Sequence, residues 1–129
     1  MKKSIIRAII IAIISYFPLI AFSQFNTSLL KAIEKEKFDD TEKKVLKSLQ
    51  NKPNDVELNF TMAVLYISPK YQNYNEEKAY DYLTKAQKAF ESTTDEKLIK
   101  KLDKIPINAL IFENYTDTIC RRAFTKATD

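Results

Sequence analysis

Two pairs of adjacent carboxylates are the first residues in this sequence that could do chemistry, and they are Asp39-Asp40 and Glu76-Glu77. Two carboxylates that face each other across a pocket are the catalytic pair of a glycoside hydrolase. Both pairs, however, stand where a helix is expected to begin, and an acidic side chain there is stabilised by the helix dipole. We therefore interpret them as helix-start residues and predict no catalytic carboxylates.

The only cysteine, Cys120, is followed directly by Arg121 and Arg122. Neighbouring cations lower the pKa of a thiol and favour the reactive thiolate. A cysteine nucleophile also needs a general base, and the sequence contains no histidine. We predict a half-buried cysteine on a helix, with an intermolecular disulfide as the alternative.

The residue types that the chain lacks narrow the possible chemistry further. Histidine is the commonest acid–base group and a frequent zinc ligand, and the chain has none. The chain also has no glycine, so it has no phosphate-binding loop and no dinucleotide fingerprint. We predict a protein that is not an enzyme, with no catalytic residues, no cofactor and no metal.

Five of the seven tyrosines gather in one segment: Tyr66, Tyr71, Tyr74, Tyr80 and Tyr82. Exposed, they would form an aromatic platform for a peptide or a glycan. The alternative, which we prefer, is structural, because tyrosine also suits half-buried positions that have no ligand. In that interpretation Tyr66 is a core residue, and the next two tyrosines hold a loop against the helices. Tyr71, Tyr74, Tyr80 and Tyr82 remain candidate partner-binding residues.

Residues 1–23 have the composition of a secretory signal peptide. Lys2, Lys3 and Arg7 precede an apolar run at 8–22, and Ala21 and Ser23 form a small-residue cleavage site. An uncut anchor is the alternative, but the apolar run is shorter than the ~20 residues that a membrane span needs. We predict cleavage after Ser23, export to the periplasm or cell envelope, and no integral membrane span afterwards.

Cleavage also changes the charge balance. The whole chain has 21 Lys and Arg against 17 Asp and Glu, and three of the basic residues leave with residues 1–23. The remaining 18 basic and 17 acidic residues nearly cancel, and they are interleaved along the chain. A nucleic-acid-binding domain normally carries a basic patch or stripe. We therefore predict no nucleic-acid partner.

The apolar residues after Gln24 follow a helical period throughout, and we find no strand. Pro53 stops the second helix, and Asn54 or Asp55 can cap the third. The third helix is apolar on more than one face, so we expect it to be the central element. The expected helices lie at about 27–37, 39–51, 55–67, 76–91, 94–103 and 107–127.

The helices repeat in pairs. Leu29 and Ala32 match Ala63 and Tyr66 at an offset of 34 residues. Three residues of the second helix match three of the fourth at an offset of 38: Thr41, Val45 and Ser48 against Ala79, Leu83 and Ala86. An insertion at 68–75 accounts for the difference between the two offsets. A period near 34 residues built from two helices is the tetratricopeptide signature.

The spacing of Phe38, Thr41, Val45 and Ser48, followed by Pro53-Asn54, resembles the second helix of a tetratricopeptide repeat. The departures are a weak aromatic position at Ala32 and an acidic residue, Glu76, in place of the aromatic one. The resemblance implies an all-α domain at 24–129, a right-handed array of antiparallel helix pairs. Its units are about 27–53 and 55–91, and 94–127 is a degenerate third pair or a cap. The small residues of the offsets, including Ser48, are then expected at helix–helix contacts.

The resemblance extends to the N-terminal repeat region of larger secreted bacterial proteins. It implies a non-catalytic scaffold in the envelope of a Gram-negative bacterium that binds a protein or peptide between stacked helix pairs. The alternatives are a glycan- or peptidoglycan-associated accessory protein that uses the Tyr66–Tyr82 cluster, and an N-terminal fragment of a longer outer-membrane-associated protein.

The last helix carries apolar residues on several sides. A single neighbouring helix cannot cover all of them, and an uncovered apolar face usually marks an interface. We therefore predict a docking surface at 107–124 that includes Ile111 and Phe112. It would bind a second copy or the rest of a longer chain. Replacing these two residues by Glu would then abolish a dimer.

Overall fold

The computed structural model describes residues 27–105 and 107–128, so the predicted signal peptide lies outside the described residues. The described residues form six helices and no strand, which confirms the all-α prediction. The helices are α2 (Ser28–Glu34), α3 (Phe38–Asn51), α4 (Val56–Tyr66), α5 (Glu76–Ser92), α6 (Glu96–Lys104) and α7 (Ala109–Thr128).

Short polar side chains cap the N-termini of several of these helices. The Asp55 carboxylate accepts a hydrogen bond from the Leu58 N–H at 2.9 Å, and the Asn75 side chain accepts one from the Lys78 N–H at 2.9 Å. Such caps satisfy backbone donors that have no partner inside the helix. Helix α6 is capped by Asp95, whose carboxylate accepts hydrogen bonds from the N–H groups of Lys97 and Leu98.

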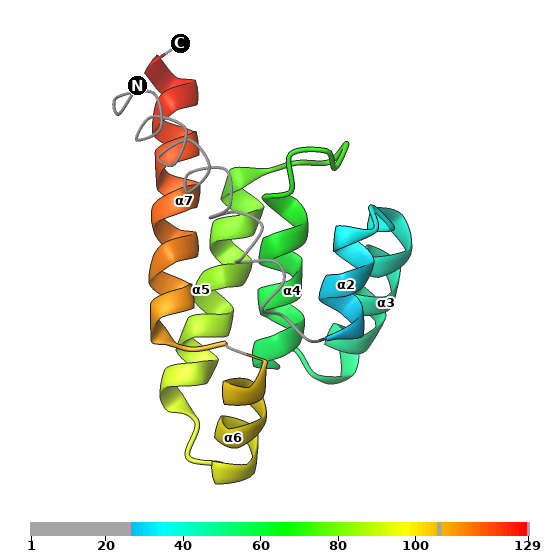
Figure 1. Ribbon diagram of the computed structural model, residues 1–129, viewed down its shortest axis with the longest axis vertical. Helices are drawn as coiled ribbons and strands as arrows, with labels where there is room; N and C mark the ends of the chain where they lie inside the picture. Colours follow the sequence, from blue (N-terminus) through cyan, green and yellow to red (C-terminus); the bar gives the residue numbers. More distant parts are fainter. Residues whose placement is uncertain (1–26, 106, 129) are drawn as a thin grey trace, which may run out of the picture.

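Helices α2 to α5 pack against one another in the order of the chain, and the next helix to pack on α5 is α7 instead of α6 (Figure 1). Helices α2 and α3 form one pair and α4 and α5 the next, while α2 and α3 both contact α4. Helix α7 lies against α5, and its side chains also reach α4, where Phe112 contacts Phe60. The short α6 sits at one end of the molecule and is not part of this series of packed helices.

Helix α4 is the central element, as its apolar pattern predicts. Every residue from Asn59 to Tyr66 is buried. A buried polar side chain needs hydrogen-bond partners, and the Asn59 amide donates to the carbonyl oxygens of Pro53 at 3.0 Å and Asp55 at 2.8 Å. Asn59 thereby ties the turn before α4 to the helix itself.

Four of the five small residues predicted at helix contacts are buried: Thr41, Ala63, Ala79 and Ala86. Ser48 is exposed instead, and its hydroxyl donates to the Lys44 carbonyl oxygen at 3.0 Å. The covered stripe of α3 runs through Val45 to the half-buried Leu49. A spacing of four residues stays on one helix face, and this stripe leaves Ser48 to one side.

Helix α2 ends three residues earlier than expected, in a turn that normally requires glycine. Glu36 has a φ of 61°, in the left-handed region. The N–H of Lys37 donates to the Ala32 carbonyl oxygen at 3.0 Å, and the N–H of Glu36 to that of Ile33 at 2.9 Å. This pair of bonds is a Schellman motif, which usually has glycine at the left-handed position. The chain has no glycine, so Glu36 takes the strained conformation.

We expect Glu36→Gly to raise the free energy of unfolding by about 0.5–1 kcal/mol, because glycine adopts positive φ without a Cβ clash. The lost ion pair between Glu36 and Lys70 is exposed and contributes little. Urea unfolding measures the change. The control is Glu34→Gly inside α2, which should lower stability by about 1 kcal/mol. Equal destabilisation by both variants would show that Glu36 is not strained.

Candidate functional site

The tyrosine segment folds into a line of ring contacts that joins three helices. The Phe38 ring lies 5.4 Å from Tyr71, Tyr71 lies 5.9 Å from Tyr66, and Tyr66 stacks on Tyr82 at 5.8 Å with an interplanar angle of 12°. Tyr66 and Tyr71 are buried, while Tyr82 is half-buried. This aromatic row holds the loop between α4 and α5 against the start of α3, as the structural interpretation predicts.

The two remaining candidate tyrosines lie away from the row. Tyr80 is 46% exposed. A difference of two residues places Tyr80 nearly opposite Tyr82 on α5. Tyr74 is half-buried and lines a groove of about 340 Å³ with Glu76 and four residues of α7, namely Arg121, Arg122, Thr125 and Lys126. The candidate residues are therefore divided between different surfaces and do not form one platform.

Charged side chains lie around Tyr66 and Tyr82 in this row. The Lys78 ammonium lies 5.3 Å from the centre of the Tyr66 ring, and the Lys85 ammonium lies 5.4 Å from that of Tyr82. The Tyr66 hydroxyl donates to the Glu42 carboxylate at 3.4 Å. Burial, together with the negative charge of Glu42, raises the pKa of Tyr66 to about 12. Burial also raises the pKa of Tyr82.

The raised pKa of Tyr66 predicts a loss of stability at alkaline pH. The neutral phenol is favoured in the folded protein, so its contribution is complete below pH 10 and is lost as the pH rises from 10 towards about 12. Thermal unfolding across this range should therefore show a smaller decline for Tyr66→Phe than for the unmodified chain. Identical pH profiles for the two proteins would contradict the assignment.

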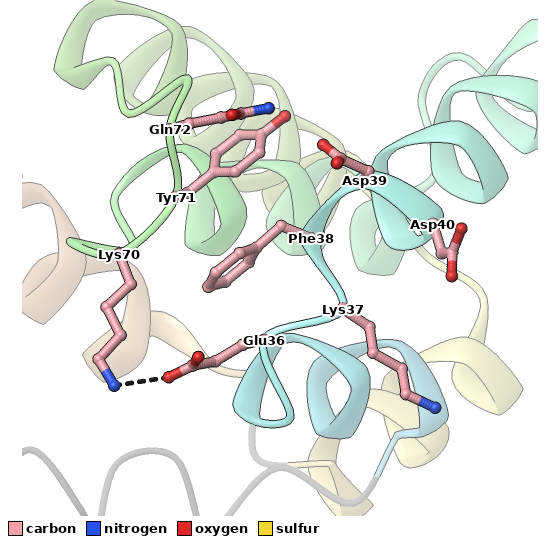
Figure 2. A pocket seen from close by; sticks show the side chains of 8 residues that line it. All are labelled: Glu36, Lys37, Phe38, Asp39, Asp40, Lys70, Tyr71 and Gln72. Atoms are coloured by element: carbon pink, nitrogen blue, oxygen red, sulfur yellow. Dashed lines mark hydrogen bonds and ion pairs between the residues drawn. The ribbon is translucent and has the colours of Figure 1, made fainter.

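A pocket of about 390 Å³ opens beside the row, where the turn before α3 meets the loop after α4. In Figure 2 the Phe38 ring lies between the Tyr71 ring and the ion pair that Glu36 forms with Lys70 at 2.6 Å. The pocket is lined by Glu36, Lys37, Phe38, Asp39, Asp40, Lys70, Tyr71 and Gln72. We call it the turn–loop pocket. It combines an aromatic floor with charges of both signs at an open rim.

Sequence reasoning did not predict the turn–loop pocket. Phe38 and Tyr71 stand 33 positions apart in the chain, and nothing in either local pattern shows that they meet. The available signal is the length of the loop at 68–75, since binding residues are often found on surface loops.

The two carboxylate pairs occupy helix starts, as predicted. Asp39 and Asp40 lie in the first turn of α3, and Glu76 and Glu77 in that of α5. The Glu76 carboxylate is 3.7 Å from the Lys126 ammonium of α7. No group of three or more histidine, cysteine or acidic side chains able to hold a metal occurs among residues 27–105 and 107–128.

Cys120 is exposed, which corrects the prediction of a half-buried thiol. The buried side of α7 passes through Ile111, Phe112 and Ile119. Cys120 is rotated by about 100° from Ile119 and therefore leaves the contact face.

The prediction that Ile111 and Phe112 lie on a docking surface is also corrected, because other parts of the chain cover both side chains. Phe112 is 1% exposed, and its ring lies 5.9 Å from Phe60 of α4 and 5.4 Å from Phe90 of α5. Ile111 is buried as well. Replacing either by Glu would place a charge in the core, so such variants test folding and not docking. The exposed large apolar residues of α7 are Leu110 and Phe124.

A hydrogen bond from Arg122 fixes the C-terminal half of α7 against α4. The Arg122 guanidinium donates to the Ile67 carbonyl oxygen at the C-terminal end of α4, at 2.6 Å. A cation there satisfies a carbonyl that has no partner in the helix and is favoured by the helix dipole. Arg122 therefore has a structural partner at the C-terminal end of α4.

A third pocket, of about 290 Å³, lies where α3 ends and α4 begins. It is lined by Leu29, Ser48, Asn51, Lys52, Asp55, Glu57, Leu58 and Lys101. The Lys101 ammonium of α6 pairs with the Glu57 carboxylate at 3.2 Å across its edge. This contact attaches α6 to the start of α4.

No family model, no curated protein and no solved structure matches this chain. Within the described residues, no helix has both the length and the apolar character to cross a membrane.

Proposed function

We propose that this chain is a tetratricopeptide-like scaffold of the bacterial cell envelope that binds a protein or peptide and is not an enzyme. The observation that carries the proposal is the packing order. Helix α2 packs on α3, α3 on α4 and α4 on α5, while α2 also lies beside α4. Repeat arrays have this pattern, because each unit contacts mainly its neighbours.

The buried small residues support the same arrangement. Thr41, Ala63, Ala79 and Ala86 allow close approach of the helices at the positions that the two sequence offsets pick out. The third pair is where the chain departs from a regular array. Helix α7 packs directly on α5, so α7, and not α6, takes the place of the next unit's first helix. Helix α6 is then an insertion between α5 and α7.

The turn–loop pocket is the best-supported binding site for the partner. Phe38 offers a half-buried ring, Asp39 and Asp40 offer negative charge, and Lys37 and Lys70 offer positive charge. A peptide with an apolar side chain flanked by charges of both signs matches these groups. The glycan alternative has less support, because Tyr66 and Tyr71 are buried and only Tyr80 among the described tyrosines is strongly exposed.

Selection of peptides from a displayed library on the purified protein tests this proposal. The tightest peptides should lose about tenfold or more in affinity, measured by fluorescence anisotropy, when Asp39→Lys or Lys70→Glu reverses one pocket charge. The matched controls reverse exposed charges on α6, Asp103→Lys and Lys100→Glu, and should have no effect. A library without binders, or binders insensitive to the pocket variants, would contradict the proposed function.

Export is a separate part of the proposal and rests on residues 1–23. Cleavage after Ser23 places Gln24 at the start of the mature protein. N-terminal sequencing of the protein from an envelope fraction checks this directly. A chain that still begins at Met1 in the membrane fraction would indicate an anchor.

A further inference from the structure

The outer face of α7 is not covered by any described element, and Arg121 at its edge also lines the groove with Tyr74 and Glu76. Leu110 and Phe124 at its two ends are 63% and 71% exposed. Every residue at the matching helical positions between them is exposed as well. We call this set the outer α7 face: Leu110, Glu113, Asn114, Asp117, Cys120, Arg121 and Phe124.

The residue types along the outer α7 face are arranged around Asp117 so that the face is complementary to an antiparallel copy of itself. Leu110 and Phe124 stand seven positions on either side of Asp117, and Glu113 and Arg121 stand four positions on either side. An apolar residue thus mirrors an apolar residue, and an acid mirrors a base. A two-fold interface between identical chains places residue i against j and j against i, so it needs a surface with this property.

We propose that the outer α7 face pairs with the same face of a second copy, antiparallel, with the two-fold axis at Asp117. Leu110 then meets Phe124 of the second copy, and Glu113 meets its Arg121. This partner is distinct from the peptide of the turn–loop pocket, which lies on other elements. The charge pattern of the face selects a second copy, because an unrelated apolar partner would have no reason to match the reversed acid and base.

The central residue opposes the pairing and limits its strength. The two Asp117 carboxylates approach each other at the axis, although each is already 2.9 Å from the Arg121 guanidinium of its own chain. A pair of single helices also forms a small interface, below about 1,200 Å² of total buried surface. The dimer is therefore reversible and concentration-dependent, and Asp117→Asn should strengthen it.

Charge exchange tests the proposed register. In sedimentation velocity over a series of protein concentrations, Glu113→Arg or Arg121→Glu alone should weaken the dimer about tenfold, because two pairs of like charge then meet. The double variant restores opposite charges and should return the dimerisation constant to within about threefold of the original. All replaced side chains are exposed, and circular dichroism confirms that each variant is folded.

Cysteine cross-linking provides a second test. Helices packed at 8–10 Å bring facing Cα atoms to roughly 4–5 Å, within disulfide range. With diamide as the oxidant, Asp117→Cys in a Cys120→Ser background should therefore form a covalent dimer. The natural Cys120 lies three residues from the axis, so the two copies of it stand ~9 Å apart along the helices and should not cross-link.

The matched control for cross-linking is Asp103→Cys in the same Cys120→Ser background, which places an exposed thiol on α6 and should remain monomeric. A protein that stays monomeric at every concentration overturns the proposal. A dimer that ignores Glu113→Arg, a double variant as weak as the single ones, or equal cross-linking at positions 103 and 117 overturns it as well. A peptide that still binds the turn–loop pocket in any of these cases leaves the proposed function standing.

Discussion

Phe112→Ala should lower the free energy of unfolding by about 3–5 kcal/mol, the largest effect expected of a single substitution in α7. Phe112 is fully buried, and its ring lies against rings on both neighbouring helices, at 5.9 Å from Phe60 and 5.4 Å from Phe90. Removing it leaves a cavity where α4, α5 and α7 meet. Urea unfolding monitored by circular dichroism measures the loss.

The control for this substitution lies two residues away on the same helix. Leu110 is 63% exposed, so Leu110→Ala should change stability by less than about 0.5 kcal/mol at protein concentrations where the chain is monomeric. The contrast separates the inner and outer sides of α7. Comparable losses for Leu110→Ala and Phe112→Ala would show that the helix is rotated from the orientation described.

Ala63→Leu should destabilise the chain by about 1–3 kcal/mol, because α4 has no space for a larger side chain at that position. Ala63 is fully buried on the central helix, at one of the positions that the repeat offsets assign to close helix contact. A shift in the melting temperature measures the effect. The change adds apolar atoms, so a loss of stability reports overpacking and not a loss of hydrophobicity.

Ala123→Leu provides the matched control for Ala63→Leu. Ala123 lies on α7 and is exposed, so the same enlargement meets solvent there. It should leave the melting temperature nearly unchanged. If Ala63→Leu were equally well tolerated, the close approach of α4 to its neighbours would be contradicted, and with it the packing on which the scaffold proposal rests.

The outer α7 face and the turn–loop pocket differ in how far the sequence could reveal them. The spacing of Leu110, Asp117 and Phe124 is visible in the sequence as one helical face, although only burial shows which face is outside. The turn–loop pocket could not be found in this way. Its walls come from two segments that become neighbours only when α2 and α3 pack against α4.

The tyrosines illustrate the same division within a single segment. Their clustering was evident from the sequence, and a structural role for Tyr66 and Tyr71 was the preferred interpretation. The stacking of Tyr66 on Tyr82, the Lys78 ammonium over the Tyr66 ring and the contact with Glu42 all depend on the relative rotation of α3, α4 and α5. A difference of one residue in helix register would have placed other side chains there.

The sequence by itself determined the features that depend on neighbours along the chain. It predicted six helices, the stop at Pro53, a cap at Asn54 or Asp55, and the central place of the helix that is apolar on several sides. These follow from local backbone preferences and from the helical period, which act within a few residues.

Only the tertiary structure decided which side of each helix is covered. Ser48 and Cys120 are exposed, whereas Ile111 and Phe112 are buried, and α7 packs on α5. The physical reason is that burial is a property of two surfaces together. An apolar residue shows that a helix needs a neighbour, but the position and rotation of that neighbour are set by the packing of the whole core.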